Sequence, residues 1–170
     1  MHDWGPGVGM RWETTESAED TDGASLVGTM WFAPGMAGPP VHVHPHAEER
    51  FTVLEGEAEV LLEGTWRRVG AGETSVVPIG APHSVRNLGD VPAKVVNTHS
   101  PAQRMEGFFV DGARLAATGK ITALPPKDAR SAIYAAMLFT KYPDEIVATG
   151  PPRLIFRALS AVGRALGWRV

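Results

Sequence analysis

Between residues 24 and 99 the chain is divided by turn residues into short runs that favour β-structure, and this pattern constrains the fold more than any other feature. Each run is rich in Val, Thr, Trp and similar residues, and each is bounded by Gly, Pro or Asp. The expected strands are 24–32, 50–54, 58–62, 66–69, 74–77, 84–87 and 94–99. Short strands at such even spacing are typical of a β-sandwich or β-barrel.

Three connections between these runs have the composition of tight turns. The segments 55–57 and 63–65 each place a glycine after a glutamate, and 88–92 contains Gly-Asp followed by Val-Pro. Such residues favour short hairpin loops. We therefore expect hairpins at all three places and an antiparallel meander around them.

Composition excludes several classes of function. The 170 residues, 44% of them hydrophobic, suffice for one globular domain with a sizeable core, and a net charge of -3 provides no positive field for nucleic acid. The absence of cysteine excludes disulfides and thiolate zinc sites, so any metal must be held by nitrogen and oxygen. The chain contains no run of about 18 apolar residues that could span a membrane, and no leader pattern is found. We therefore expect a cytoplasmic protein.

A first group of metal-ligand residue types follows the run 24–32. His42 and His44 are two residues apart, so in an extended segment their side chains share a face, and Pro45 biases His44 toward that conformation. Glu49 has the wrong parity to join them on one continuous strand, so the segment 45–48 must turn or bulge to bring it back. This part of the chain thus predicts two imidazoles and a carboxylate at one site.

A third imidazole can come from His83, because Gly80 and Pro82 shape a tight turn just before it. Three neutral imidazoles and one carboxylate leave about two positions free on a six-coordinate divalent ion. Such a site keeps roughly one positive charge, which favours an anionic or chelating ligand.

Several polar neighbours are candidates for lesser roles. We interpret His46 and Glu48 as residues at the rim or around the ligands, since their spacing fits the ligand pattern less well. Arg50 and Arg86 could meet an anionic ligand, but we favour pairing with the glutamates of this block.

Parity also places two polar residues of the run 94–99 inside the barrel. If Lys94 faces solvent, Asn97 and His99 face the interior, where they either lie beside the free coordination positions or serve to bond nearby backbone or close the barrel end. We favour the second interpretation, because buried polar groups usually serve local backbone.

The two blocks match in spacing the two signature motifs of the cupin superfamily. They are His42-x-His44-x4-Glu49-x6-Gly56 and Gly72-x5-Pro78-x-Gly80-x2-His83-x3-Asn87. Over about residues 23–110 the chain resembles a small single-domain cupin of the type-2 conserved-barrel kind. The resemblance implies a mainly β jelly-roll barrel, one divalent transition metal bound by His42, His44, Glu49 and His83, and a homodimer.

Outside the motifs we expect an N-terminal arm (1–22), the cupin barrel (23–110) and a C-terminal helical extension (111–170). Helical patterns cover 103–118, 127–142 and 153–168. The last carries a narrow arginine stripe, with apolar residues over most of the remainder, and is expected to bury a wide face. It would pack on its own barrel, on a dimer partner or, least favoured, on an anionic membrane surface.

For function, the chain resembles the flavonol-cleaving cupin dioxygenases. This implies an oxidoreductase acting on a small oxygenated organic substrate chelated at the metal, with Glu49 also able to act as a base. Fe or Mn is favoured as the metal, with Ni, Co, Cu and Zn acceptable to the same ligands. The alternatives are a redox-neutral isomerase or decarboxylase, and a non-catalytic protein that binds a small molecule or metal.

Overall fold

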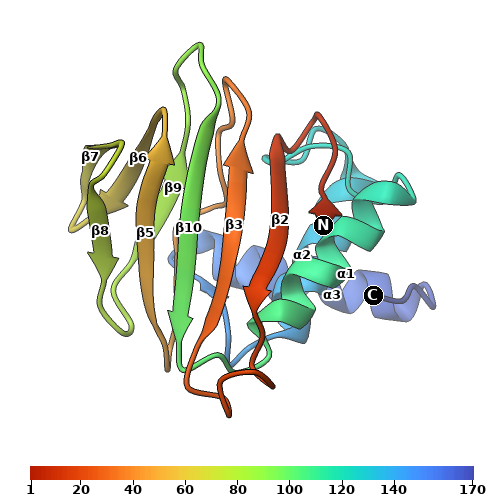
Figure 1. The fold of residues 1–170 in the computed structure, drawn as a ribbon. Helices are drawn as coiled ribbons and strands as arrows, with labels where there is room; N and C mark the ends of the chain where they lie inside the picture. Colours follow the sequence, from red (N-terminus) through yellow and green to blue (C-terminus); the bar gives the residue numbers. More distant parts are fainter.

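The computed structural model describes residues 1–170 as two antiparallel β-sheets and three helices (Figure 1). One sheet has the order β1-β2-β3-β10-β5-β8 and the other β11-β4-β9-β6-β7. The strands are β1 (His2–Asp3), β2 (Met10–Glu16), β3 (Leu26–Phe32), β4 (His42–Val43), β5 (Glu48–Glu55), β6 (Glu57–Leu62), β7 (Thr65–Gly70), β8 (Thr74–Val77), β9 (His83–Arg86), β10 (Ala93–Ser100) and β11 (Val147–Ala148). The helices are α1 (Met105–Ala117), α2 (Ala129–Lys141) and α3 (Pro151–Ala165).

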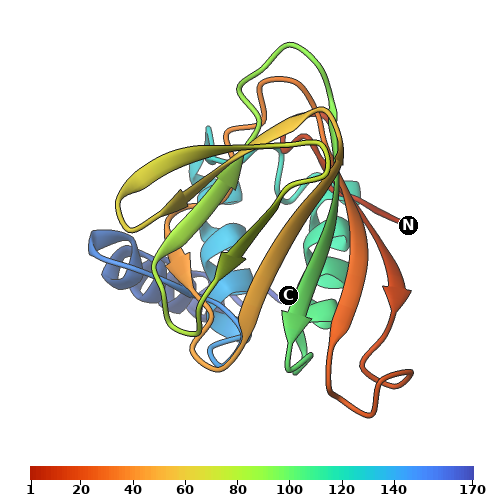
Figure 2. The same cartoon turned by 60° about the vertical axis from the view of Figure 1, so that its left-hand side comes forward.

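Alternating burial along the central strands explains how the two sheets face each other. In β10 the side chains of Ala93, Val95, Asn97 and His99 are all buried, while those between them are partly exposed. β3 alternates in the same way. Figure 2 shows the two sheets facing each other, and the buried side chains of both sheets form the core between them. The prediction of a mainly β jelly-roll fold is confirmed.

The N-terminal arm forms part of the larger sheet. β2 pairs along β3, and the indole of Trp12 is fully buried and stacks on Phe109 of α1 with ring centroids 4.1 Å apart. Gly28 of β3 lies directly against this indole, where a Cβ atom would clash. The arm therefore holds the first helix against the barrel.

Only one of the three expected hairpins is present. β6 and β7 pair on either side of the turn 63–65, as predicted. The turns 55–57 and 88–92 instead connect strands that belong to different sheets, so the hairpin prediction is wrong there. At the first of them Gly56 adopts a φ of 73° against the carbonyl of Pro92, a close approach that a side chain would prevent.

The helices lie on the open side of the barrel, beside β2 and β3 in Figure 1. α1 and α2 start and end within two residues of their predicted limits. α2 begins at a capping residue, Asp128, whose carboxylate accepts the backbone N–H of Ser131 at 2.8 Å. The short strand β11, which no sequence pattern predicted, pairs with β4.

α3 packs on α2 through a narrow face. Ser160 and Gly163 are its only buried residues, and a side chain at Gly163 would clash with Met137 and Ile133 of α2. The expectation that the helix buries a wide apolar face is wrong within this chain, because four large apolar side chains are 47–70% exposed. These are Leu154, Ile155, Val162 and Leu166. None of the helices is both long and apolar enough to cross a membrane.

Candidate metal centre

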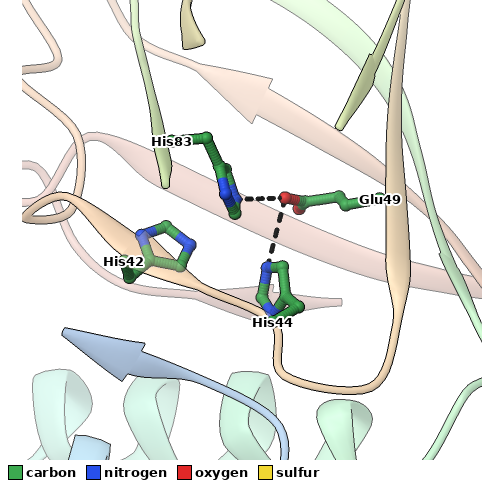
Figure 3. Close-up of side chains that lie close together, drawn as sticks. All are labelled: His42, His44, Glu49 and His83. Atoms are coloured by element: carbon green, nitrogen blue, oxygen red, sulfur yellow. Dashed lines mark hydrogen bonds and ion pairs between the residues drawn. The ribbon is translucent and has the colours of Figure 1, made fainter. Parts of the chain in front are cut away.

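The structure brings His42, His44, Glu49 and His83 together in the interior (Figure 3). All four are at most 5% exposed, and one ligand atom from each lies within 4.8 Å of the others. We call these four residues the metal cluster.

The cluster is assembled from both sheets. His42 of β4 pairs directly with His83 of β9, whereas Glu49 belongs to β5 in the opposite sheet. The segment 45–48 crosses between the sheets, and the carbonyl of His44 accepts the N–H of Gly80 at 2.9 Å. The crossing solves the parity problem between His44 and Glu49, because the two side chains approach each other from opposite walls.

Backbone carbonyls fix the orientation of the three imidazoles. Nδ1 of His42 donates to the carbonyl of Pro40 and Nδ1 of His83 to that of Ala81, both at 2.9 Å. Nδ1 of His44 donates to the carbonyl of Glu145, in the loop between α2 and β11. A carbonyl oxygen only accepts, so each Nδ1 carries a proton and each Nε2 can offer its lone pair to a metal. This is the arrangement that neutral metal-binding histidines use. Without a metal, Nε2 of His44 can instead be protonated and donate to Oε2 of Glu49 at 3.2 Å.

The carboxylate of Glu49 presents one oxygen to the imidazoles. Its Oε2 lies 2.7 Å from Nε2 of His83 and 3.2 Å from Nε2 of His44. In an octahedral site with bonds of about 2.1 Å, neighbouring ligand atoms are about 3.0 Å apart, which these two distances bracket. The His83 nitrogen nevertheless has no hydrogen-bond partner, so its lone pair faces an oxygen lone pair at close range.

The electrostatics of the cluster also fit a cation. Burial, together with the positive charge that His83 and His44 would add, holds the pKa of His42 well below its ordinary value. Burial alone would raise the pKa of Glu49, but the neighbouring His99 and His44 hold it well below its ordinary value. Burial opposes protonation of His44, yet the Glu49 carboxylate raises its pKa. An anionic carboxylate among converging lone pairs requires a positive charge between them, so these residues fit a divalent metal ion.

Two further polar residues contact the other oxygen of Glu49. Nδ2 of Asn97 donates to Oε1 at 2.9 Å and also to the carbonyl of Arg50. Nε2 of His99 lies 3.3 Å from the same Oε1, and neither ring nitrogen of His99 has a hydrogen-bond partner. Burial lowers the pKa of His99 to about 3, so the ring is neutral. The interpretation that these residues bond to local backbone thus holds for Asn97, which also contacts the carboxylate, and is wrong for His99.

A small apolar cavity of about 60 Å³ adjoins the cluster. Phe108 and Phe109 of α1, Phe139 of α2 and Ile146 line it together with barrel residues, Trp4 of the arm and the cluster residues His42, His44 and Glu49. The polar part of its wall is almost confined to those three. Sequence reasoning missed Phe139 and Ile146, since no motif reaches the C-terminal third of the chain.

The remaining candidates lie outside the cluster. His46 is exposed, and Glu48 pairs with Arg50 at 2.7 Å, as predicted. Arg86 was expected to pair with a glutamate of the first block, but it pairs with Glu59 at 2.8 Å and covers the ring of Trp66. The expectation failed because Glu59 lies beside Arg86 on the neighbouring strand β6.

Comparison with known proteins identifies the barrel. Residues 28–99 match the family model described as a cupin domain. Nectarin-1 of Nicotiana langsdorffii x Nicotiana sanderae is 36% identical over 93 residues, which cover 49% of this chain and 40% of the nectarin. Germin-like protein 3-5 of Oryza sativa subsp. japonica is 42% identical over 81 residues, 41% of this chain and 35% of that protein. The chain thus spans well under half the length of these relatives.

Among solved structures, the TT1209 protein of Thermus thermophilus superposes with a TM-score of 0.52 at 26% identity, covering 59% of this chain and 90% of that one. KdgF of Halomonas sp. has the same fold, with a TM-score of 0.51 at 23% identity over 58% of this chain and 84% of that one. The matching domain, the two-sheet barrel and the buried cluster lead to one conclusion. Residues 28–99 of this chain form a cupin domain.

Proposed function

We propose that this cupin is a metal-dependent oxidoreductase of the dioxygenase type, acting on a small oxygenated organic substrate. The main support for the proposal is that the two carboxylate oxygens of Glu49 have different neighbours. One carboxylate oxygen faces the imidazoles, while the other contacts Asn97 and an otherwise unpartnered His99. A purely structural metal site has no use for a free buried base beside its carboxylate.

A redox-active ion held by the metal cluster would supply a Lewis acid and adjacent positions for a chelating substrate and dioxygen. Glu49 would accept the proton of a substrate hydroxyl, with Asn97 holding the carboxylate in place. Nε2 of His99 has no hydrogen-bond partner and lies 3.3 Å from Oε1 of Glu49, so it would be within reach of that proton, and burial of the ring would favour its rapid return. The phenylalanines of the cavity would keep water away during these transfers.

The size of the cavity limits the substrate. About 60 Å³ accommodates a few water molecules or a group of a few heavy atoms, whereas sites for drug-sized ligands measure roughly 300–1,000 Å³. A three-ring flavonol would require α1 or α2 to move. We therefore propose an enol, a phenol or a hydroxy acid of smaller size.

A redox-neutral isomerase or decarboxylase is the second candidate. It is favoured by the same unpartnered His99, because proton transfer beside a Lewis acid is all that such reactions need from the protein. It differs from the first candidate in consuming no oxygen.

Elemental analysis and oxygen uptake test the proposal. The purified protein should hold one equivalent of Fe or Mn, and the variants His83→Ala and Glu49→Ala should lose it. Glu49→Gln, which keeps an oxygen ligand but removes the base, should retain metal and lose turnover on a panel of small phenols, enols and hydroxy acids. Turnover of a panel compound without oxygen uptake would select the redox-neutral candidate. Absence of metal after reconstitution would refute both.

We also propose that the protein is a homodimer. The exposed apolar side chains of α3 and of its C-cap residue Leu166 offer a surface of about 400 Å², the size of the largest apolar patch on a typical protein, which is often functional. Sedimentation equilibrium should show a dimer for the wild type. The variant Ile155→Lys should shift the monomer–dimer equilibrium toward the monomer. A wild type that stays monomeric at high micromolar concentration would exclude the dimer.

A further inference from the structure

A surface groove of about 580 Å³ lies between α2, β11 and α3, outside the metal centre. Its floor is apolar and includes Phe139, Ile146 and Phe156. Three arginines of α3 stand along one side: Arg153, Arg157 and Arg164. We call this feature the arginine groove.

The positive charge of the arginine groove is uncompensated. No carboxylate lines it, and residues 151–170 contain four arginines and no Asp or Glu. Arg164 is held in place, because its Nη1 donates to Oγ of the buried Ser160 at 2.6 Å. Ser160 is itself bonded to Thr140 of α2 at 2.6 Å. At least one guanidinium is thus positioned before any ligand arrives.

The arginine groove shares a wall with the small apolar cavity that adjoins the metal cluster. Phe139 and Ile146 line both, and the ring of Phe139 lies between that of His42 (centroids 6.5 Å apart) and that of Phe156 on the groove side (5.2 Å). β11 supplies Val147 and Ala148 to the groove and pairs with β4, where Ala148 is the partner of His42. Only one layer of side chains separates the two spaces.

We propose that the arginine groove binds small organic carboxylates that carry an apolar part, and that these are the substrate class of the metal centre. The second half of this proposal rests on the proposed function. Guanidinium groups match a carboxylate by paired N–H donors, and the aromatic floor matches the apolar part. The small cavity holds only a few heavy atoms, so most of such a molecule stays in the groove while its reacting end passes the Phe139 side chain.

A solvated charged face is the usual interpretation of an arginine stripe, but it fits this one poorly. These arginines are exposed, but one side of the stripe borders a groove whose other lining residues are mainly apolar. The rest of the chain carries a net charge of -7, from -3 in total minus +4 in residues 151–170, yet none of its carboxylates lines the groove. The site therefore selects for an external anion.

Calorimetric titration of the full-length protein with benzoate and octanoate tests the groove directly. We expect one site per chain in the wild type and binding at least tenfold weaker in the double variant Arg153→Gln, Arg157→Gln. Ala161→Glu places a negative charge on the exposed groove side of α3 and should abolish binding. Arg169→Gln removes an exposed charge of the same tail outside the groove and should leave binding unchanged.

The outcomes separate the groove from the metal chemistry. The proposal that the groove binds carboxylates would be refuted if neither probe bound the wild type, or if the wild type and the double variant bound them equally well. This holds whatever the oxygen uptake shows. The same proposal would be refuted if the protein adsorbed to phosphatidylserine vesicles through these arginines and bound neither carboxylate. If carboxylates bind in an arginine-dependent way but the metal-loaded protein turns none of them over, the groove is a carboxylate site. The proposal that these carboxylates are substrates of the metal centre is then refuted. Metal content should be the same in all these variants.

Discussion

Metal binding should stabilise the fold through the buried cluster, and the size of the effect can be estimated. The four ligands come from strands β4, β5 and β9 and the adjoining loop, so the site exists only in the folded chain. A ligand that binds the folded state alone adds about 2.7 kcal/mol when its free concentration is one hundred times Kd. For 170 residues the entropy of unfolding is about 0.36 kcal/mol/K. Metal at one hundred times Kd should therefore raise Tm by about 7.5 °C.

Differential scanning calorimetry with matched variants measures this effect. Chelator-treated protein is scanned with and without Mn²⁺, and the quantity compared is the increment in Tm. His83→Ala removes one ligand and should abolish the increment at the same Mn²⁺ concentration, although its metal-free Tm also falls because the side chain is fully buried. His46→Ala alters an exposed histidine of the same block and should keep the full increment.

The pH dependence of the increment gives a second check. Because the Glu49 carboxylate raises the pKa of His44, the metal-free protein is stabilised by a proton on His44. That contribution is complete below the unfolded pKa of about 6.5 and disappears as the pH rises through the folded pKa. The metal needs the unprotonated ring, so the increment should be larger at pH 8 than at pH 5.5. An increment that survives in His83→Ala, or no increment with Mn, Fe, Co, Ni or Zn, would refute the assignment of the cluster.

Three further predictions concern one neighbour of the metal cluster and two residues of the helices. Asn97→Leu removes the donor to the carboxylate ligand and should weaken metal binding about 10–100-fold in a chelator competition; an unchanged affinity would remove the positioning role. Asp111→Asn weakens contacts with Lys141 and should cost about 1–3 kcal/mol in urea unfolding at pH 7. Burial would raise the pKa of Asp111, but hydrogen bonds from Lys141 and Tyr142 hold it below the ordinary value. The difference in stability should therefore begin to shrink as the pH falls below about 4 and vanish only below the lowered pKa of the folded state, and a constant difference would contradict this. Gly163→Ala should lower Tm, because the clash with α2 outweighs a gain in helix propensity of about 1 kcal/mol, and a raised Tm would show that α3 is not held there.

Local sequence patterns predict the strands and part of the metal cluster, because both depend on short-range periodicity. His42, His44 and the burial of Asn97 and His99 follow from alternation along a strand. The spacing of Glu49 and His83 required the resemblance as well, since no local rule says which strands of a barrel face each other.

The turns show where such reasoning ends. Gly56 and Gly64 both adopt φ values above 70° and both follow a glutamate, yet only the second closes a hairpin. A tight turn fixes the local change of direction but not the sheet that the next strand joins, which is decided by burial of the whole barrel. The walls formed by Phe139 and Ile146 were likewise beyond prediction, because their place depends on how α2 and β11 pack against β4.

The C-terminal third belongs to the metal centre as much as the motifs do. The carbonyl of Glu145 holds Nδ1 of His44, which sets the tautomer of one ligand, while Phe109 and Phe139 close the cavity beside it. In the barrel without these elements, His44 would have water as its partner, and the cluster would open to solvent. Water at the site would weaken each electrostatic contact of Glu49 and add competing ligands at the free coordination positions. The motifs of the barrel therefore supply a cluster that can hold a metal. On the proposed function, the helices that follow them would determine which small molecules reach it.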